Sequence, residues 1–299
     1  MLDKIASSSN PLGNICEVNQ GVLSGADTLT DKHIEKFGKL GDKSDGIFVL
    51  DLKNTNDLEF YNSIPESEKN IIRPFYKNSN IEKYKTISFP TKFIIYITKK
   101  TKIENYPIIL NYLEKFKLIL QEKRETKNGK LPWYSLHWTR NQSIFDGEKI
   151  IVPYRSSTNT FGYSNNSCYF RTDAYSIIAK NKDYSNKFLL GVLNSKLIYK
   201  WLKIKGKNKG EILELFYEPL SKIPIPILDT PERQLLATQI EELVEEILQV
   251  KNTPTVGVER SLGVVGDDRS NTTELESQID TLVYQLYDLT AEEIAIVEG

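Results

Sequence analysis

Apolar residues near the C-terminus recur at a spacing that leaves little choice of structure. Over 230–251 they follow one another by four, three, four and three positions, and the same spacing returns over 272–289. The two series are Leu236, Ile240, Leu243, Ile247 and Val250, and Leu275, Ile279, Leu282, Leu286 and Leu289. Each series marks one face of an α-helix, so the matching faces predict an antiparallel hairpin with coiled-coil-like packing.

Helix-end signals support this interpretation. Thr230 and Pro231 suit the N-cap and the first position of the first helix. Thr290 and Glu293 form a capping box for a last short helix. Residues 252–271, between the two long segments, show no clear period, and we expect a mobile loop there.

The preceding residues, 1–228, have the pattern of a mixed α and β structure. Short β-branched or aromatic runs bounded by turn residues predict strands at 46–52, 92–98, 149–155 and 175–180. Longer amphipathic segments predict helices at 106–125 and 185–205. We therefore expect an α+β fold, in which a mixed twisted sheet with helices (1–228) precedes the helical hairpin (229–299).

Charge divides the chain at the same place. Residues 229–299 hold 4 Lys or Arg and 16 Asp or Glu, a net charge of −12, whereas residues 1–228 hold 35 and 24, a net charge of +11. The excess is concentrated in 77–209, with 26 basic and 9 acidic residues. This asymmetry favours an anionic partner for the basic part, against the alternative that its lysines form only solvated faces.

Compartment and membrane signals are few. No run of 18 apolar residues occurs, and the N-terminal "MLDKIASSSNPLG" lacks the basic and apolar regions of a secretory signal. Cys16 and Cys168 are the only cysteines, which is too few for a disulfide framework or a zinc site. We expect a cytoplasmic protein with reduced thiols, no membrane association and no bound metal.

Catalytic motifs are sparse. No Gly-rich loop precedes Lys-Ser or Lys-Thr, and His137 has no nucleophile or carboxylate near it in sequence. Asp45, Asp51 and Lys53 resemble the carboxylate and lysine set of a metal-dependent nuclease. Such short matches arise by chance, and a strand-edge aspartate is the favoured interpretation, although the nuclease remains an alternative.

Two segments instead have the composition of a nucleic-acid-binding surface. "WYSLHWTRN" (133–141) and "VPYRSSTNTFGY" (152–163) combine aromatics with Arg, Asn, Ser and Thr, and Arg and Asn make bidentate contacts with guanine and adenine edges. The loop "KIKGKNKGE" (203–211) alternates lysines with Gly or Asn, a pattern suited to phosphates or to a solvated turn. In the first segment Trp133, Leu136 and Trp138 are expected to anchor a polar face.

These segments, in this order, resemble a known family. "WYSLHWTRNQSIFDGEKIIVPYRSSTNTFGY" is similar to the central signature of the TaqI-like C-terminal specificity domain of type IIG restriction–modification enzymes and adenine methyltransferases. "VNQGVLSGADTLT", "IIRPFYKNSNI", "FLLGVLNSKLIYKWLKIKGKNKGEILELFYEPLSKIPIP" and "IDTLVYQLYDLTAEEIAIVE" extend the resemblance from about residue 12 to the C-terminus.

The resemblance implies a target recognition domain of a restriction–modification or phage-defence system. Such a domain reads a short double-stranded DNA sequence and places the target adenine at a methyltransferase domain, with which an endonuclease domain can be associated. That domain carries S-adenosylmethionine and an Asn-Pro-Pro-Tyr motif, whereas this chain has only "SNPLG" at 9–13. The resemblance therefore implies a chain without catalytic activity or cofactor, partnered by a methyltransferase in cis or in trans.

Chemistry and resemblance together select the candidate DNA contacts. They are Arg73, Lys77, His137, Arg140, Asn141, Arg155, Ser156 and Asn159, with Lys203, Lys205, Lys207 and Lys209 as phosphate contacts. Arg155 has an alternative role, in which it pairs with a carboxylate such as Asp146 or Asp173 and braces the preceding strand. A protein-binding module dominated by the acidic helices is a further alternative function.

Overall fold

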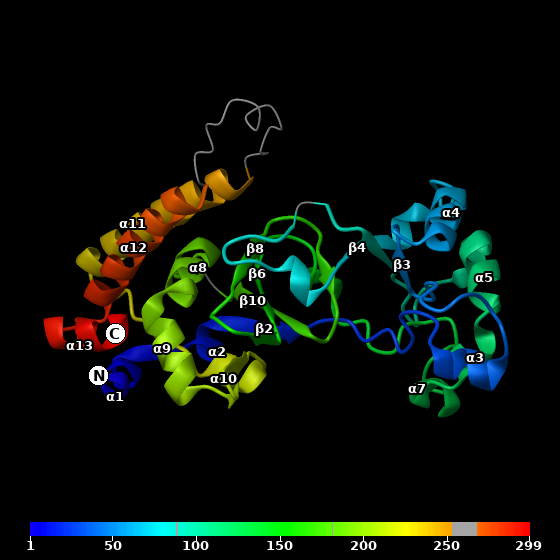
Figure 1. The fold of residues 1–299 in the computed structure, drawn as a ribbon, viewed down its shortest axis with the longest axis horizontal. Helices are drawn as coiled ribbons and strands as arrows, with labels where there is room; N and C mark the ends of the chain where they lie inside the picture. The colour runs from blue at the N-terminus through cyan, green and yellow to red at the C-terminus, as the bar shows by residue number, and fades with distance from the viewer. Residues whose placement is uncertain (88, 181, 253–267) are drawn as a thin grey trace.

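A four-stranded antiparallel sheet, in the order β2-β10-β6-β8, lies at the centre of the molecule (Figure 1). A computed structural model describes residues 1–87, 89–180, 182–252 and 268–299. The central strands are β2 (Cys16–Gln20), β10 (Ala174–Ala179), β6 (Lys149–Pro153) and β8 (Gly162–Ser164). Tyr175 of β10 stands opposite Gln20 on one side and Val152 on the other. The strands predicted at 149–155 and 175–180 are confirmed.

The two faces of this sheet belong to two different hydrophobic cores. Successive side chains of a strand point to opposite faces. Ile150 and Val152 of β6 accordingly contribute to one core, while Ile151 between them contributes to the other. The sheet is thus a wall shared by the two halves of the molecule.

The second core lies around a mixed sheet in the order β3-β5-β4-β9, on the right in Figure 1. Its strands are β3 (Val49–Asp51), β5 (Lys92–Ile95), β4 (Ile72–Tyr76) and β9 (Tyr169–Phe170), and β4 and β9 are parallel. The helices in this half are α3 (Asp31–Phe37), α4 (Thr55–Ser63), α5 (Pro107–Glu114), α6 (Lys117–Gln121) and α7 (Arg124–Lys127). The mixed α+β class predicted for 1–228 is confirmed.

The single helix predicted over 106–125 is wrong, because the segment forms α5, α6 and α7. Its start at Pro107 is correct. At the first break the N–H of Phe116 donates to the carbonyl of Leu113, 2.9 Å away and three residues back. At the second break Lys123 leaves the helical conformation, with a ψ of 131°. Both side chains are buried, so tertiary packing interrupts the helical period.

The helix predicted over 185–205 is also two helices, α8 (Asn186–Asn194) and α9 (Lys196–Lys205). Ser195 is extended between them, and its hydroxyl accepts a hydrogen bond from the N–H of Ile198. Asn194 bonds both the N–H and the carbonyl of Phe161. The break therefore ties the helices to the loop before β8.

The predicted helical hairpin is confirmed. It consists of α11 (Pro231–Asn252) and α12 (Asp268–Leu286), and the capping box at Thr290 opens α13 (Ala291–Glu298). Its buried residues join the core that contains α8 and α9. The loop expected over 252–271 lies largely outside the described residues. The division of the chain at residue 228 stays a prediction.

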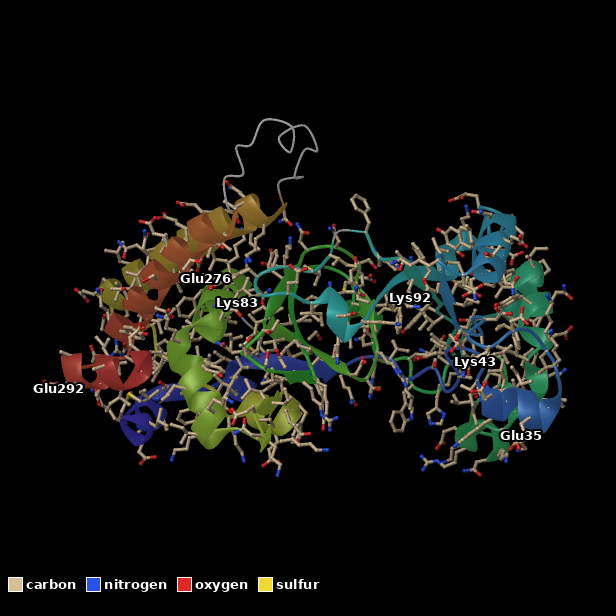
Figure 2. All side chains as sticks on the ribbon, viewed as in Figure 1. Glu35, Lys43, Lys83, Lys92, Glu276 and Glu292 are labelled. Atoms are coloured by element: carbon tan, nitrogen blue, oxygen red, sulfur yellow. The ribbon has the colours of Figure 1, made fainter. Side chains whose placement is uncertain are left out.

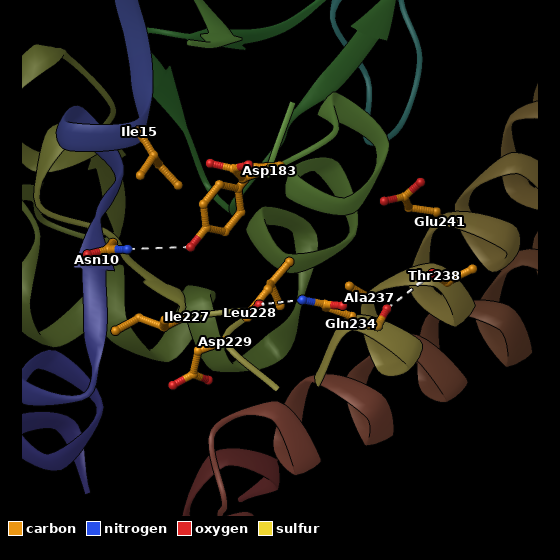
Figure 3. A pocket seen from close by; sticks show the side chains of 11 residues that line it. Asn10, Ile15, Asp183, Ile227, Leu228, Asp229, Gln234, Ala237, Thr238 and Glu241 are labelled. Carbon is orange, nitrogen blue, oxygen red and sulfur yellow. Dashed lines mark hydrogen bonds between the residues drawn. The ribbon is translucent and has the colours of Figure 1, made fainter. Parts of the chain in front are cut away.

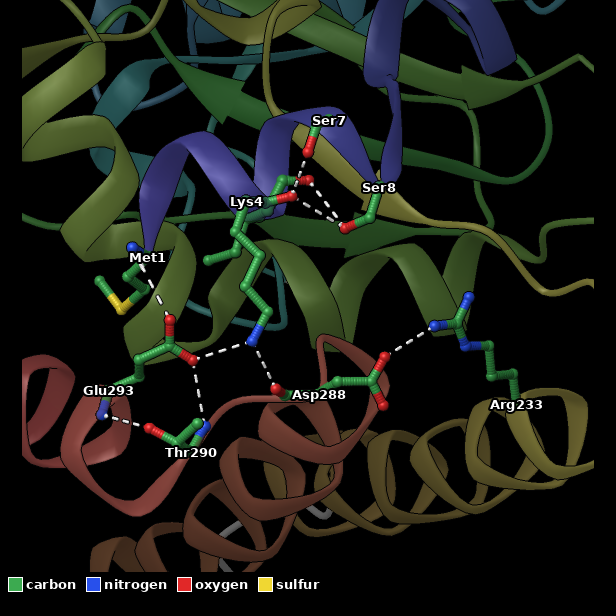
Figure 4. Close-up of polar contacts among 9 residues, drawn as sticks. Met1, Lys4, Ser7, Ser8, Arg233, Asp288, Thr290 and Glu293 are labelled. Carbon is green, nitrogen blue, oxygen red and sulfur yellow. Dashed lines mark hydrogen bonds and ion pairs between the residues drawn. The ribbon is translucent and has the colours of Figure 1, made fainter.

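Ion pairs connect the acidic helices of 229–299 to the basic part of the chain, residues 1–228. Lys83 and Glu276 approach to 2.5 Å (Figure 2), and Lys187 and Glu245 to 2.6 Å. At the other end Glu293 accepts from Lys4 at 3.0 Å and lies 3.7 Å from the terminal amine of Met1 (Figure 4). The hairpin thus packs on the basic part of its own chain.

Short elements complete the fold. The remaining strands form two small antiparallel sheets, β1-β13 and β11-β12-β7. Their bounds are β1 (Ser9–Pro11), β13 (Pro224–Pro226), β11 (Asn208–Lys209), β12 (Ile212–Glu214) and β7 (Arg155–Ser156). The other helices are α1 (Leu2–Ser7), α2 (Leu12–Ile15) and α10 (Tyr217–Ser221), with 3-10 helices at Lys69–Ile71, Asn78–Asn80, Ile103–Asn105 and Gln142–Ile144. None of the helices in the described ranges is long and apolar enough to cross a bilayer.

Candidate nucleic-acid interface

The small sheet β11-β12-β7 brings together two segments that are about fifty residues apart in sequence. Arg155 stands opposite Glu214, Ser156 opposite Leu213, and Lys209 opposite Ile212. Gly210, with a φ of +60°, permits the tight turn between β11 and β12. Residues 155–157 ("RSS") and the lysine-containing loop 203–211 therefore form one continuous surface.

Arg155 is braced in its exposed position. Its Nε and Nη2 donate to Oε1 of Glu214 at 3.2 and 3.0 Å, and its Cζ lies 5.2 Å from the centre of the Tyr154 ring. The carboxylate partner is neither Asp146 nor Asp173, the two suggested by sequence. The guanidinium remains half exposed, so bracing and exposure coexist.

The loop after Arg155 is anchored from beneath. Asn159 is only 5% exposed, and its side-chain amide donates to the carbonyls of Leu193 and Ser195, each at 2.8 Å. The expectation that Asn159 belongs to a polar reading surface is therefore corrected, because both of its N–H donors point into the protein. Ser156 stays near the surface and shares a 2.8 Å hydrogen bond with Thr160.

The four loop lysines are not equivalent. Lys203 pairs with Glu211 at 2.7 Å, and Lys205 pairs with Asp3 at 2.9 Å. Within the described parts of the chain, neither Lys207 nor Lys209 forms an ion pair, and both side chains are exposed. Lys207 and Lys209 are therefore the members most available to an external anion.

The segment 133–141 is rigidly held. Leu23 and Trp138 exchange main-chain hydrogen bonds of 3.1 and 2.8 Å. Arg140 adopts a φ of +63°, and its Nε and Nη2 donate to Gly21 and to Oε1 of Gln20. A left-handed conformation is uncommon for a residue with a side chain, and these contacts hold it in place.

The polar face of this segment differs in part from the prediction. Trp138 is 44% exposed rather than an anchor, and the Arg140 guanidinium lies 5.5 Å from its ring centre. His137 is half-buried beside Trp138, and burial lowers its pKa. Asn141 is exposed, and its side chain accepts from the N–H of Ser143.

A buried lysine supports the segment from inside. Lys123 is 7% exposed, and its Nζ donates to the carbonyls of Trp133, at 2.8 Å, and Ser135. Burial lowers the pKa of Lys123 to about 7. Sequence reasoning missed this residue, because nothing in its neighbourhood marks it as different from an exposed lysine.

One pocket lies between the two candidate segments. Its lining residues are Gln20, Tyr154, Arg171, Thr172, Asp173, Tyr175 and Phe216. Gln20 accepts from Arg140, while Tyr154 lies beneath the Arg155 guanidinium. The exposed guanidinium groups of Arg140 and Arg155 therefore lie on either side of this pocket.

Two charged residues of this pocket were absent from the sequence-based set. Arg171 is exposed and pairs with Asp27 at 3.4 Å. Burial raises the pKa of Asp173, and the nearby Arg171 opposes that rise. The charged side chains in "FRTD" (170–173) could have suggested a binding role, but the sequence does not show whether they are exposed.

Arg73 and Lys77 lie on and beside β4, in the other sheet. Arg73 is half-buried, and its Nε is enclosed without a hydrogen-bond partner among the described residues. Lys77 is exposed just beyond β4, whose last residue, Tyr76, stands opposite Phe170, the residue before Arg171 of the pocket. Lys77 thus neighbours the pocket, whereas Arg73 lies within the sheet.

Asp45 and Asp51, the carboxylates considered for a metal-dependent nuclease, instead make hydrogen bonds and an ion pair within the protein. Asp45 is buried and accepts from Asn54 and Asn56 at 3.1 Å. Asp51 pairs with Lys92 and accepts from the N–H of Lys53. Among the residues that the structure describes, no group of three His, Cys, Asp or Glu side chains is placed to hold a metal ion.

A second pocket, between β1 and α11, has a different character (Figure 3). Asn10 donates to the Tyr184 hydroxyl at 3.4 Å, and Gln234 donates to the carbonyl of Leu228 at 3.1 Å. Asp183, Asp229 and Glu241 also line it. This acidic lining is unsuited to phosphate, and none of the residues that line the pocket is a candidate DNA contact.

Comparison with known proteins places these features in a family context. Residues 73–225 match the TaqI-like C-terminal specificity domain. The chain is 27% identical over 227 residues to the type II methyltransferase M.HindII of Haemophilus influenzae. This aligned region covers 73% of this chain and 39% of that protein. It is 32% identical over 115 residues to M.HincII of the same species, covering 36% and 23%. The chain therefore spans well under half the length of these relatives.

Two solved structures share the fold. The type IIL restriction-modification enzyme MmeI, solved in complex with DNA, has a TM-score of 0.62 at 16% identity, over 96% of this chain and 35% of that chain. The type IIG restriction endonuclease BpuSI has a TM-score of 0.50 at 14% identity, over 96% and 32%. At these identities the likeness concerns the fold alone.

Proposed function

Because the chain belongs to the TaqI-like C-terminal specificity domain family, we propose that it recognises a short sequence in double-stranded DNA. It does so on behalf of a restriction–modification methyltransferase and positions the target adenine for that enzyme. The methyltransferase domain, which would bind S-adenosylmethionine, lies outside this chain, in cis or in trans, and an endonuclease domain can accompany it. The chain itself contributes binding rather than catalysis.

One observation carries the proposal. Exposed cations from distant segments meet around the pocket between 133–141 and 152–163, with Arg140 on one side, Arg155 on the other, and Lys207 and Lys209 on the adjoining sheet. Main-chain hydrogen bonds near Arg140 and strand pairing at Arg155 hold both arginines in place. A positive surface with fixed arginines suits a duplex, because phosphates supply affinity and base edges supply specificity.

The contacts divide into two roles. Arg155, Ser156, Arg140, His137 and Asn141 are proposed to face base edges. Lys207 and Lys209, with Lys77 beyond the pocket, are proposed to contact phosphates and fix the register of the duplex. Lys203 and Lys205 would contribute after exchanging their carboxylate partners for phosphate.

Selection from a randomised duplex library tests the function and defines the preferred site. If binding neutralises six to ten phosphates, raising the salt concentration from 50 to 200 mM should lower the affinity about 10³–10⁵-fold. Arg155→Ala should cost about 1–3 kcal/mol on the preferred site and little on unrelated DNA. Lys207→Ala should weaken every sequence about equally and reduce the salt slope by roughly one unit.

The control is Lys43→Ala, which removes an exposed lysine paired with Asp31 in the other half of the molecule. Its affinity and salt slope should match those of the unmodified chain. Failure to enrich any sequence, together with affinity that is flat across the salt range, would contradict the proposal.

A further inference from the structure

We propose that Glu214 is a positioning residue for DNA reading, which holds the guanidinium of Arg155 so that its outer edge meets a guanine. This inference rests on the proposed function. It also resolves the two roles considered for Arg155, because the residue that braces the side chain leaves its reading edge uncovered.

The donors of Arg155 divide cleanly between protein and solvent. A guanidinium has five N–H groups in a fixed planar fork. Nε and one hydrogen of Nη2 point to Oε1 of Glu214. Among the described residues no acceptor contacts Nη1. Nη1 and the second Nη2 hydrogen therefore form a free parallel pair, the pair that matches O6 and N7 of guanine in the major groove.

Glu214 is itself well fixed. Its side chain is 13% exposed, against 51% for Arg155. It lies on β12 directly opposite Arg155, and its N–H donates to the carbonyl of Lys207 at 2.8 Å. The neighbouring N–H of Leu215 donates to Tyr154, whose ring lies beneath the guanidinium. The carboxylate and the aromatic ring thus restrict the arginine from two sides before DNA arrives.

This arrangement separates two effects of Glu214. Fixing the rotamer in advance reduces the ordering that reading would otherwise require, so it favours the correct base pair. The carboxylate also repels nearby phosphates, and that repulsion acts on every sequence. Removing Glu214 should therefore reduce discrimination between base pairs while leaving, or raising, the affinity for unrelated DNA. A residue with a structural role alone would weaken both.

The test compares Glu214→Ala, Glu214→Gln and Glu211→Ala with the unmodified chain. Glu211 lies on the same β-hairpin but pairs with Lys203, so Glu211→Ala removes a carboxylate without touching Arg155. Affinity is measured for the selected duplex, for that duplex with the guanine replaced, and for unrelated DNA. Melting temperature is recorded for each variant.

Glu214→Ala should lose roughly ten-fold in discrimination at one base pair, with undiminished affinity for unrelated DNA. Glu214→Gln, which keeps an oxygen acceptor, should retain most of the discrimination, and Glu211→Ala should retain all of it. In the Arg155→Ala background, Glu214→Ala should cause no further loss, because both act through one contact.

Three results would overturn the inference. The first is full discrimination in Glu214→Ala. The second is equal weakening on all sequences in Glu214→Ala and Glu214→Gln, which would assign Glu214 to the scaffold. The third is an additive loss in the double variant. If Arg155→Ala loses discrimination and Glu214→Ala does not, the inference fails and the proposed function stands; if the unmodified chain enriches no sequence, the proposed function fails first.

Discussion

Lys123 places an amine inside the protein, where its only described hydrogen-bond acceptors are main-chain carbonyls. Burial lowers its pKa to about 7, whereas a lysine in an unfolded chain keeps its proton to about pH 10.4. Between these values the unfolded state binds more protons than the folded state. The contribution of Lys123 to the free energy of unfolding therefore rises as pH increases through this window.

Replacing Lys123 with Met should flatten this dependence. From pH 7 to 9 the free energy of unfolding should rise by up to about 1.4 kcal/mol per pH unit more in the unmodified chain than in Lys123→Met. Urea unfolding at pH 7, 8 and 9 measures the difference. His137 and Glu125 lie nearby, but both pKa values are lowered, so these groups titrate below the window.

The matched control is Lys115→Met, because Lys115 is exposed on the same stretch of helices. Its stability curve should run parallel to that of the unmodified chain. Parallel curves for Lys123→Met as well would show that the Lys123 proton is not linked to folding.

At the same scale, residue types were easier to predict than residue partners. Arg155 could be selected from its chemistry and motif, but Glu214 is 59 positions away and became its partner only through pairing of β7 with β12. Asn159 has the composition of a base reader, yet burial assigns both of its donors to carbonyls of the α8–α9 junction. Exposure depends on long-range packing, which local patterns do not contain.

Among the elements, the helical hairpin was predicted closely, because its seam is a local periodic signal. The two long helices of the basic part were predicted as continuous, because their apolar period continues across the breaks. Buried Phe116 and Lys123 interrupt one helix, and Asn194 and Ser195 interrupt the other. The Asn194 break depends on contact with Phe161, 33 positions away, and the other breaks depend on burial of Phe116 and Lys123, so no local pattern marks them.

Packing of α8 on the hairpin depends on Gly191. A Cβ at this position would lie 2.5 Å from Cγ2 of Ile240 and 3.1 Å from Cγ2 of Val244. Gly191→Ala should gain at most about 1 kcal/mol from helix propensity but lose about 1–3 kcal/mol from overpacking, a net destabilisation. Urea unfolding of the single variant measures the loss.

The double variant identifies the cause. Ile240→Ala removes the obstructing methyl group, so adding Gly191→Ala to that background should be neutral or stabilising. An equal loss in both backgrounds would mean that the helix backbone, rather than contact with Ile240, requires glycine.

Across the whole molecule, charge and packing join the acidic hairpin to the rest of the chain. Its apolar seam enters the core of α8 and α9, and Lys4, Lys83 and Lys187 pair with its carboxylates. The N-terminal helix α1 reaches the same end, so residues from both termini meet there (Figure 4). Stability of this half therefore depends on segments at opposite ends of the sequence.

Deleting 229–299 should expose that core. The truncated chain should lose its cooperative unfolding transition and aggregate, as measured by circular dichroism and size-exclusion chromatography. Glu242→Gln with Glu246→Gln removes exposed acidic charge and keeps the apolar seam, so that variant should unfold as the intact chain does. A truncated chain that still unfolds cooperatively would show that residues 1–228 fold without 229–299, which would contradict this prediction.

The anchoring of the loop after Arg155 has a consequence for how such a protein changes over generations. Asn159 and Asn194 fix the course of the main chain through contacts that involve none of the outward-facing side chains at 155, 156 and 158. Mutations at those positions would remove local hydrogen bonds, such as the one between Ser156 and Thr160, but would keep the anchors that Asn159 and Asn194 provide. Under the proposed function, a lineage could therefore acquire a new target sequence in single steps, each intermediate remaining a stable protein on which selection can act.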